Sequence, residues 1–342
     1  MKFDHHAPDP TVTVVHHADG RGAWGTRGRS IFHAAGTGSG WTRIGSFPAK
    51  LPTDLAIGRP ARRLLRSDKC NVYPTREGRL LGIRQGVVYR FDDGAAKPLF
   101  RIHGDCVMNR GIAEDAEGNL FFGEYFGNPR REPVRIWRVA PDLESFEVAR
   151  TIEAGRTRHI HAVHIDPFHE GRLWITMGDF QGECFLAYSD DSFRSLHFLG
   201  DGSQLWRMVG IVFQEDRLCW LTDSHIDQNR IVSMDRARKE PVIHGDRDAS
   251  SWYVAETSDG LYLATTCVEP GPGIHTTDVR LLASEDGIEW EPVAEFAKDR
   301  LPMKLGFGSV SLPSGAFSRG AFWISGEAVD PLDGRAQLCQ IR

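Results

Sequence analysis

The feature that most constrains this chain is a recurring pair of strand-like segments separated by a short polar turn. In each copy, a segment of alternating apolar and polar residues precedes a second segment rich in Trp, Phe or Leu, at a spacing of very roughly 40 to 60 residues. The copies read RGIAEDAEGNLFFGEY, HAVHIDPFHEGRLWITMGD, MVGIVFQEDRLCWLTDS, WYVAETSDGLYLATTCVEP and GSVSLPSGAFSRGAFWISGEA. The turns are ordinary, whereas the residues that follow the second segment are polar and differ between copies. The repeat therefore predicts a repeated scaffold that carries a functional site at one end.

Two further strands follow each pair, for example RIWRVAP and SFEVARTI after Tyr125. Repeated units of four strands predict an all-β protein with the β-propeller architecture. Pairs begin near residues 70, 110, 160, 207, 252 and 307, and the segment from Thr11 to Pro48 contains strands for another unit. We favour seven blades of four antiparallel strands, with six blades as the alternative.

The domain organisation follows from the same repeat. We expect a single propeller domain over residues 1–342, with residues 1–10 flexible. Helical periodicity is mixed and confined to residues 51–67, where Pro60 limits any helix.

Composition excludes several classes of function. The 41 basic and 46 acidic residues give a net charge of −5, so no global field attracts nucleic acid or an anionic membrane. No segment has the apolar length of a membrane span, and the start, MKFDHHAPDPTV, lacks the features of a secretory signal. We therefore expect a cytoplasmic protein without nucleic-acid or membrane partners. The six cysteines occur singly, which indicates reduced thiols, and Cys184 and Cys219 lie in apolar strand contexts.

The chemically capable residues concentrate in one set of connections. In a propeller, the connection that enters the first strand of a blade and the connection that leaves the second strand open on the same face, around the central channel. The groups on these connections are Asn109, Arg110, Arg158, His159, His161, Gln204, Trp206 and Arg207 on entry, and Glu124, Tyr125, Asp179, Asp223, His225, Glu269 and Glu327 on exit. We predict that they meet in a pocket.

Histidine spacing indicates a metal or substrate site at this face. His159 and His161 are two residues apart on a strand, so they project from the same side at roughly 7 Å spacing, which suits shared metal ligation or a joint grip on substrate. A divalent metal ion of the Ca or Mn/Zn type in the central channel is the implied cofactor. His164 falls on the other side and is expected to be a hydrogen-bonded core residue. The doublets His5–His6 and His16–His17 are expected to be exposed.

Tyr125 and three arginines suit recognition of an acidic sugar. Tyr125 is a candidate general acid or base if neighbouring cations lower its pKa, and otherwise a stacking platform for a sugar ring. Arg110, Arg158 and Arg207 together would form a fork-like site for a carboxylate, or would pair with acidic residues of the protein.

The remaining candidates are carboxylates and substrate-binding groups. Glu124, Asp179 and Asp223 are the candidate catalytic carboxylates, together with His159 and His161 as acid–base groups. The further candidates for substrate binding are Asn109, Gln204, Trp206, His225 and Glu269. Trp206 is expected to stack on a ligand, because it lies in an entering connection.

A turn pattern gives the first family resemblance. SEDGIEW, Ser284–Trp290, matches Ser-x-Asp-x-Gly-x-x-Trp in compressed form, and SDDSF at Ser189 is a more degraded copy. Such boxes occupy the hairpin between the third and fourth strands of a blade, where Asp and Gly form the turn. The chain thus resembles the Asp-box propellers, a superfamily that includes sialidases.

A second resemblance is local. VGIVFQEDRLCWLTDSHIDQNRI resembles the repeat of the gluconolactonase and regucalcin group, although Val209 stands where that group has a metal-binding Asn. RGIAEDAEGNLFFGEY is similar to another repeat of the group, and there Asn109 precedes the strand. The resemblance implies a calcium-dependent lactonase with Glu124, Asn109 and Asp223 as oxygen ligands.

These patterns favour a carbohydrate-active enzyme that acts on an acidic, uronate-type small molecule or oligosaccharide. In the favoured lyase reaction, Arg or a metal ion neutralises the carboxylate, His or Tyr removes the proton at carbon five, and a second group protonates the leaving oxygen. One alternative is a glycoside hydrolase with paired carboxylates, Asp179 with Glu124 or Asp223. The calcium-dependent lactonase and a non-catalytic propeller that binds glycans or proteins are also compatible with the sequence.

Overall fold

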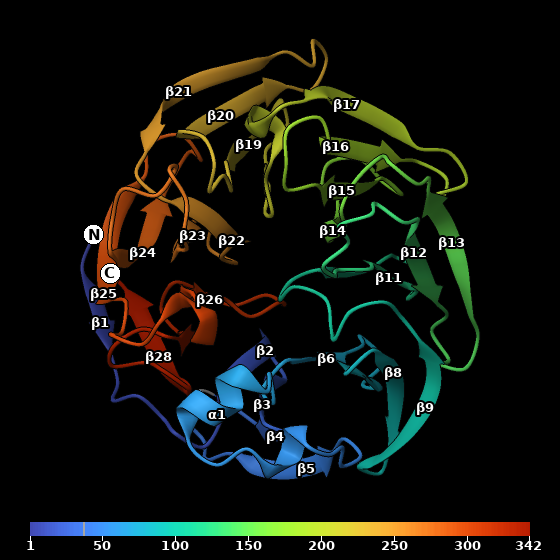
Figure 1. The fold of residues 1–342 in the computed structure, drawn as a ribbon, viewed down its shortest axis with the longest axis vertical. Helices are drawn as coiled ribbons and strands as arrows, with labels where there is room; N and C mark the ends of the chain where they lie inside the picture. Colours follow the sequence, from blue (N-terminus) through green and yellow to red (C-terminus); the bar gives the residue numbers. More distant parts are fainter. Residues whose placement is uncertain (37) are drawn as a thin grey trace.

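The computed structural model describes residues 1–36 and 38–342. Antiparallel strands follow one another in groups of four, and consecutive strands within a group are paired neighbours. Figure 1 shows the groups around a common axis, with first strands such as β14 (Ile160–Ile165) and β22 (Ser250–Glu256) nearest the axis and fourth strands such as β17 (His197–Gly202) at the rim. This arrangement is a β-propeller, which confirms the predicted all-β class.

Some groups form separate sheets. Their strands are β10 (Ile112–Glu114), β11 (Leu120–Gly123), β12 (Val134–Val139) and β13 (Phe146–Ile152); β14, β15 (Leu173–Met177), β16 (Cys184–Ser189) and β17; and β18 (Val212–Phe213), β19 (Arg217–Leu221), β20 (Asn229–Asp235) and β21 (Pro241–Arg247). All these pairings are antiparallel.

Other groups are joined to their neighbours by a short pairing. A parallel pairing of Ser46 with Ala95 links the first two groups of the chain. The strands of one group are β2 (Val14–Asp19), β3 (Gly22–Arg27), β4 (Ser30–Ala34) and β5 (Thr42–Ser46). Those of the other are β6 (Cys70–Pro74), β7 (Leu80–Arg84), β8 (Val87–Asp92) and β9 (Ala95–Arg101). An antiparallel pairing that includes Cys267 with Ser309 links β22, β23 (Tyr262–Val268), β24 (Asp278–Ser284) and β25 (Glu291–Ala297) to β26 (Gly308–Ser311).

The two ends of the chain close the ring together. The C-terminal strands β26, β27 (Phe322–Glu327) and β28 (Arg335–Ile341) are completed by β1 (Phe3–His5), whose Phe3 pairs with Ile341. Figure 1 accordingly shows the N- and C-termini side by side. The first ten residues, which we expected to be flexible, therefore include a paired strand.

The core lies between successive sheets. Every residue of β15 is buried, because a sheet covers each of its faces, and its sequence LWITM is correspondingly apolar throughout. Phe121 and Phe193, from adjacent groups, pack edge to face with ring centroids 5.6 Å apart. Trp174 and Trp220 are likewise buried between sheets.

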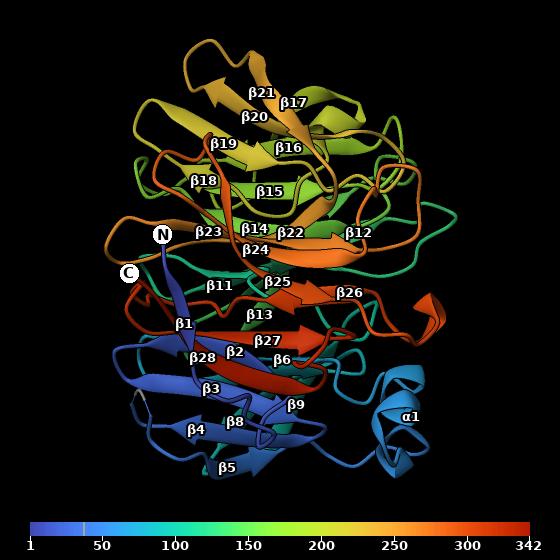
Figure 2. The same ribbon diagram turned by 90° about the vertical axis from the view of Figure 1, so that its left-hand side faces the viewer.

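The helical elements are few and short. α1 (Arg59–Leu64) lies within the segment predicted to be helical, and Pro60 occupies its first turn, where a missing N–H costs little. Figure 2 shows that α1 projects from one face of the ring. Single 3₁₀ turns lie at η1 (Thr53–Leu55), η2 (Gln204–Trp206) and η3 (Met303–Leu305). None of the helices in the described part of the chain is long and apolar enough to cross a membrane.

Two hairpins between third and fourth strands share a turn design. In Ser284–Trp290, between β24 and β25, the Asp286 Oδ1 accepts hydrogen bonds from the backbone N–H groups of Ile288 and Glu289 at 2.9 and 2.8 Å. In the hairpin between β16 and β17, the Asp191 Oδ1 accepts the N–H of Ser195 at 2.8 Å. In both turns an aspartate side chain accepts backbone hydrogen bonds between the third and fourth strands of a group.

Candidate functional site

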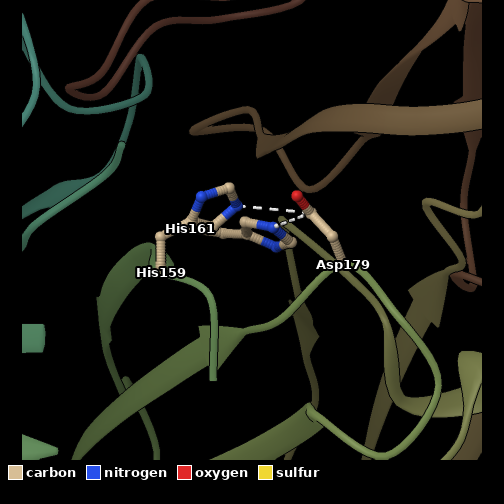
Figure 3. Close-up of side chains that lie close together, drawn as sticks. All are labelled: His159, His161 and Asp179. Carbon is tan, nitrogen blue, oxygen red and sulfur yellow. Dashed lines mark hydrogen bonds and ion pairs between the residues drawn. The ribbon is translucent and has the colours of Figure 1, made fainter. Parts of the chain in front are cut away.

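A polar cluster lies at the channel end on the face from which α1 projects. Its central group is the Asp179 carboxylate, which follows β15. Oδ1 lies 3.3 Å from the His159 Nε2, 3.1 Å from the His161 Nε2 and 3.3 Å from the Arg207 Nη2. Oδ2 accepts a hydrogen bond from the Arg158 Nη1 at 2.8 Å. Figure 3 shows both imidazole rings directed toward the carboxylate. Four of the predicted site residues therefore converge on a fifth.

The backbone orients both histidines. The His159 Nδ1 lies 2.9 Å from the carbonyl oxygen of Phe126, and the His161 Nδ1 lies 2.8 Å from that of Met208. His161 is also the extra residue of a β-bulge, because Ile160 and Ala162 pair with consecutive residues of β15. Bulges re-aim side chains at sheet edges, which accounts for the position of this ring. The prediction that His159 and His161 share a side is confirmed.

The two histidines determine the ionisation of Asp179. Burial alone would raise the pKa of this carboxyl, but the nearby His159 and His161 rings lower the pKa well below its usual range. Asp179 is therefore an anion throughout the physiological range.

Arg207 connects Asp179 to a second carboxylate. Its Nη2 lies 3.4 Å from the Asp223 Oδ2, and its Nη1 donates to the His225 Nδ1 at 2.7 Å. The pKa of Asp223 is raised to about 7, mainly by burial. The positive charge of Arg207 opposes this rise, and the negative charge of Glu269 adds to it. Burial and Arg207 lower the pKa of His225, which favours the neutral ring and allows its Nδ1 to accept a hydrogen bond from the guanidinium.

Glu269 supplies a third carboxylate at the end of β23. Its Oε1 accepts a hydrogen bond from the Ser250 Oγ at 2.8 Å. Burial raises the pKa of Glu269, although Arg207, Ser250 and Trp252 act in the opposite direction. Asp179, Asp223 and Glu269 thus come from three successive groups of strands, all within the influence of one guanidinium.

Tyr125 packs against the two histidines, and its pKa is shifted in the direction opposite to the expected one. Its ring centroid lies 4.2 Å from that of His159 and 6.2 Å from that of His161. Burial raises the pKa of Tyr125, and Asp179 and Asp223 raise it further. The expectation that cations would lower this pKa is wrong, because the surrounding carboxylates outweigh Arg207.

A cavity of about 360 Å³ opens beside Tyr125 and extends beneath α1. Two of its lining residues, His16 and Trp252, are extra residues of β-bulges in first strands, like His161. Glu327 also lines it, and its Oε2 pairs with the Lys69 Nζ at 2.5 Å. Bulges therefore turn residues of several first strands toward the channel.

Two predicted site residues lie outside the cluster. Glu124 is fully buried, and its carboxylate accepts hydrogen bonds from the His103 N–H at 3.0 Å and the Trp137 Nε1 at 3.3 Å. It is a structural acceptor, and it does not join Asp223 as the lactonase resemblance required. Arg110 donates to the carbonyl oxygen of Pro313, and burial lowers its pKa to about 10. The predicted three-arginine fork is therefore wrong, because Arg110 is buried and donates to a backbone carbonyl outside the cluster.

Other predicted substrate-binding residues have different surroundings. Trp206 is buried against Trp220, with ring centroids 5.6 Å apart, so the prediction that it stacks on a ligand is wrong. Gln204 is also buried; its Nε2 donates to the Asp179 carbonyl at 3.2 Å and its Oε1 accepts from the Ser224 Oγ at 2.7 Å. Gln204 therefore holds the backbone of Asp179 and the side chain of Ser224 in place. Asn109 lines the cavity.

Three histidines on β2 and β14 lie outside the cluster. His16 and His17, which we expected to be exposed, are each 5% exposed, and burial lowers the pKa of both to about 4. The expectation failed because β2 is an inner strand. The His164 Nε2 lies 2.9 Å from the Val209 carbonyl oxygen, as expected for a hydrogen-bonded core residue.

Several residues of this face were not predicted from the sequence. Ser250, Trp252 and Tyr253 lie at the start of β22, and Lys69 directly precedes β6. A signal did exist for β22, because these residues enter the first strand of a repeat in the place that His159 and His161 occupy in another. No comparable signal distinguished Lys69 from an exposed lysine.

Comparisons with known proteins establish the fold but no family. No protein-family model matches the chain, and no curated protein matches it. Among solved structures, the GH74 xyloglucanase from Xanthomonas campestris aligns with a TM-score of 0.53 at 16% identity, over 88% of this chain and 48% of that one. The GH74 enzyme from Niastella koreensis aligns with a TM-score of 0.52 at 12% identity, over 84% and 47%.

The tricorn protease aligns with a TM-score of 0.52 at 11% identity, over 99% of this chain and 36% of that one. The chain thus spans half or less of each of these three proteins. At such identities the similarity shows a shared fold alone.

Proposed function

We propose that this protein is a glycoside hydrolase acting on an acidic sugar. The observation that carries the proposal is the gathering of three carboxylates, Asp179, Asp223 and Glu269, about the Arg207 guanidinium, beside a cavity lined by aromatic rings. Glycosidic bond cleavage needs two carboxyl groups in different protonation states on either side of the bond. This cluster provides more than one such pair.

Asp223 is the proposed general acid and Glu269 the proposed ionised partner. Burial raises the pKa of both, and the Glu269 charge raises that of Asp223, so the two hold one proton at neutral pH. The Ser250 Oγ donates to Glu269 and stabilises its anion, whereas the Asp223 Oδ1 is buried without a hydrogen-bond partner. The proton therefore resides on Asp223, ready for the leaving oxygen.

Cationic and aromatic groups support binding of an acidic sugar. Arg158 is partly exposed and lies at the edge of the cluster, so its guanidinium is available to a substrate carboxylate in addition to Asp179. The Arg207 Nε is buried without a protein partner. Tyr125 and Trp252 line the cavity, whose volume of about 360 Å³ is suited to a sugar ring.

Two observations favour hydrolysis over the lyase reaction that the sequence suggested. The raised pKa of Tyr125 makes its phenolate a poor candidate for the base that removes a carbon-bound proton. The structural similarity to two GH74 enzymes, one a xyloglucanase, also supports hydrolysis over elimination, within the limits of fold similarity.

The test is incubation with uronate-containing oligosaccharides and 4-nitrophenyl glucuronide, with neutral oligosaccharides in parallel. We expect new reducing ends without the absorbance of an unsaturated product, and a loss of kcat of roughly 10²- to 10⁴-fold in Asp223→Asn and Glu269→Gln. Asp246→Asn, an exposed change in the same group of strands as Asp223, is the control and should keep full activity.

Three results would contradict the proposal in distinguishable ways. Unsaturated products would identify a lyase. Sugar binding without turnover in the wild-type protein would identify a non-catalytic binding propeller. Turnover that survives both carboxylate variants would remove the assignment of Asp223 and Glu269.

We also infer that the groups of strands are seven blades, with β1 completing the last one, and that the two Asp-containing hairpins are Asp-box turns. The pairing of β1 with β28 supports the blade count, because it supplies the fourth strand to a group that otherwise has three. An experimental structure with a different number of groups would contradict this inference.

A further inference from the structure

We propose that the His159 Nε2, the His161 Nε2 and the Asp179 Oδ1 bind a divalent transition-metal ion of the zinc class. These three ligand atoms are buried and lie within 4.8 Å of one another. Two imidazoles and one carboxylate are a donor set that Zn²⁺ and related ions prefer. The proposal is independent of the sugar hydrolysis proposed above.

The hydrogen bonds of the rings determine where their protons lie. A backbone carbonyl can only accept a hydrogen bond, so the Nδ1 atoms that face Phe126 and Met208 both carry hydrogen. In a neutral imidazole, the Nε2 then presents a lone pair. Both lone pairs point toward the Asp179 Oδ1, which is also an acceptor. A single proton could bridge Oδ1 to only one of the two nitrogens. A metal ion would meet all three acceptors at once.

One of these atoms is also unsatisfied. The His159 Nε2 is buried and has no hydrogen-bond partner, although the residue is only 3% exposed. A buried polar atom left without a partner is costly, and such atoms mark sites for ions or water. A metal ion would satisfy this nitrogen and the His161 Nε2 together.

The distances fit tetrahedral coordination. Bonds of about 2.0 to 2.1 Å from zinc to nitrogen or oxygen place neighbouring ligand atoms about 3.3 Å apart. The separations between the Asp179 Oδ1 and the two Nε2 atoms are 3.3 and 3.1 Å. These two separations match the expected spacing, and all three ligand atoms lie within 4.8 Å of one another.

The charge and orientation of the surroundings also fit. While Asp223 is protonated, the charges of Asp179 and Glu269 balance those of Arg158 and Arg207, so no excess positive charge repels a cation. Arg158 holds the Asp179 Oδ2 at 2.8 Å and so turns Oδ1 toward the histidines. Such outer hydrogen bonds to ligating groups commonly fix metal sites.

The donor set selects the type of ion. Calcium prefers six to eight oxygen ligands, whereas this site offers two nitrogens and one oxygen. Three protein ligands would leave a fourth position open, as in catalytic zinc sites. The Tyr125 ring packs against that of His159. We therefore expect one Zn²⁺ per chain and no tight binding of Ca²⁺.

The test measures metal rather than activity. Purified full-length protein is stripped with a chelator, dialysed, and titrated with Zn²⁺ and Ca²⁺ by calorimetry, with elemental analysis of the loaded protein. The exposed doublet His5–His6 is replaced by Ala in every sample, because exposed histidine pairs bind zinc adventitiously. We expect one Zn²⁺ per chain, no heat with Ca²⁺, and a loss of affinity of at least about 100-fold in His161→Gln and in Asp179→Asn.

His164→Gln is the matched control, because it removes an imidazole from the same strand without touching the site. Absorption of the Co²⁺-substituted wild-type protein in the visible range gives a second readout that does not depend on the variants folding. Absence of stoichiometric Zn²⁺ from wild type, or an equal loss in His164→Gln, would overturn the proposal. A nuclear magnetic resonance titration showing both imidazoles protonated at neutral pH with Zn²⁺ present would overturn it equally.

Discussion

Asp166 provides a sharp test of how neighbouring sheets are held together. Its carboxylate accepts hydrogen bonds from the Arg236 Nη1 at 2.6 Å and Nη2 at 3.1 Å, and from the Trp174 Nε1 at 2.8 Å. Arg236 belongs to the group of strands β18–β21, whereas Asp166 directly follows β14. The pair therefore joins adjacent groups. The perturbation is Asp166→Asn, which keeps the size and one acceptor but removes the charge.

The expected cost follows from burial. Breaking a fully buried ion pair costs about 3 to 5 kcal/mol, because the remaining charge is left without compensation. The Asp166 side chain is fully buried and that of Arg236 is 17% exposed, so water partly compensates the guanidinium. Asn also keeps the hydrogen bond from Trp174. We therefore expect a loss of about 2 to 3 kcal/mol in the free energy of unfolding.

The matched control is Asp190→Asn. Asp190 accepts the same two-pronged hydrogen bonding from Arg172, at 2.7 and 2.8 Å, but its side chain is 43% exposed. Surface ion pairs contribute about 0 to 1 kcal/mol. Urea unfolding followed by tryptophan fluorescence and circular dichroism measures both variants. Equal losses in Asp166→Asn and Asp190→Asn, or a loss under about 1 kcal/mol in both, would refute the argument from burial.

The pH dependence adds a second check. Burial alone would raise the pKa of Asp166, but the bonds from Arg236 and Trp174 lower it overall. A carboxyl with a lowered folded-state pKa stabilises the protein above its unfolded pKa of about 3.9 and loses this contribution as the pH falls. The difference between wild type and Asp166→Asn should therefore be complete at neutral pH and shrink below about pH 4.

Three further predictions concern the ring and the site. Deleting the strand Phe3–His5 removes a pairing and part of an apolar contact, so the free energy of unfolding should fall by about 2 kcal/mol in urea; an unchanged midpoint would contradict closure by β1. Gly123→Ala should lower the free energy of unfolding by about 1 to 3 kcal/mol, because its Cβ would lie 2.4 Å from the Ile160 Cβ. The control Gly127→Ala should leave the stability unchanged in the same thermal-unfolding assay. Similar losses of stability in both variants would contradict this reasoning. The pKa of Asp223 is raised to about 7, so this carboxyl takes up a proton on folding. The stability of the wild-type protein, measured in the presence of a chelator, should therefore fall as the pH rises from about 4 to 7, and that of Asp223→Asn should not. Parallel pH profiles of the two proteins would show that the pKa of this carboxyl is not perturbed.

The site could be predicted in part from sequence. His159, His161, Asp179, Arg207 and Asp223 meet as expected from their places on entering and leaving connections. This succeeded because the ends of first and second strands in a radial array must lie around one axis, whatever the residues there.

The failures share a physical cause. Glu124 and Trp206 occupy the predicted connections, but they turn into the protein, where one accepts hydrogen bonds and the other packs on Trp220. Sequence gives the place of a residue along a connection but not the direction of its side chain. The β-bulges that place His16 and Trp252 at the cavity were also not predicted from the sequence.

Sequence alone determined that this chain is a propeller, because the repeat of four strands and the balance of apolar and polar residues permit few other ways to bury both faces of each sheet. The tertiary structure decided which polar groups share a site and in what ionisation. Those properties depend on burial and on distances between charges from different blades, such as Asp179, Arg207 and Glu269, which lie far apart along the chain. Only folding brings these charges into one low-dielectric pocket, where a few ångströms decide which carboxyl keeps its proton.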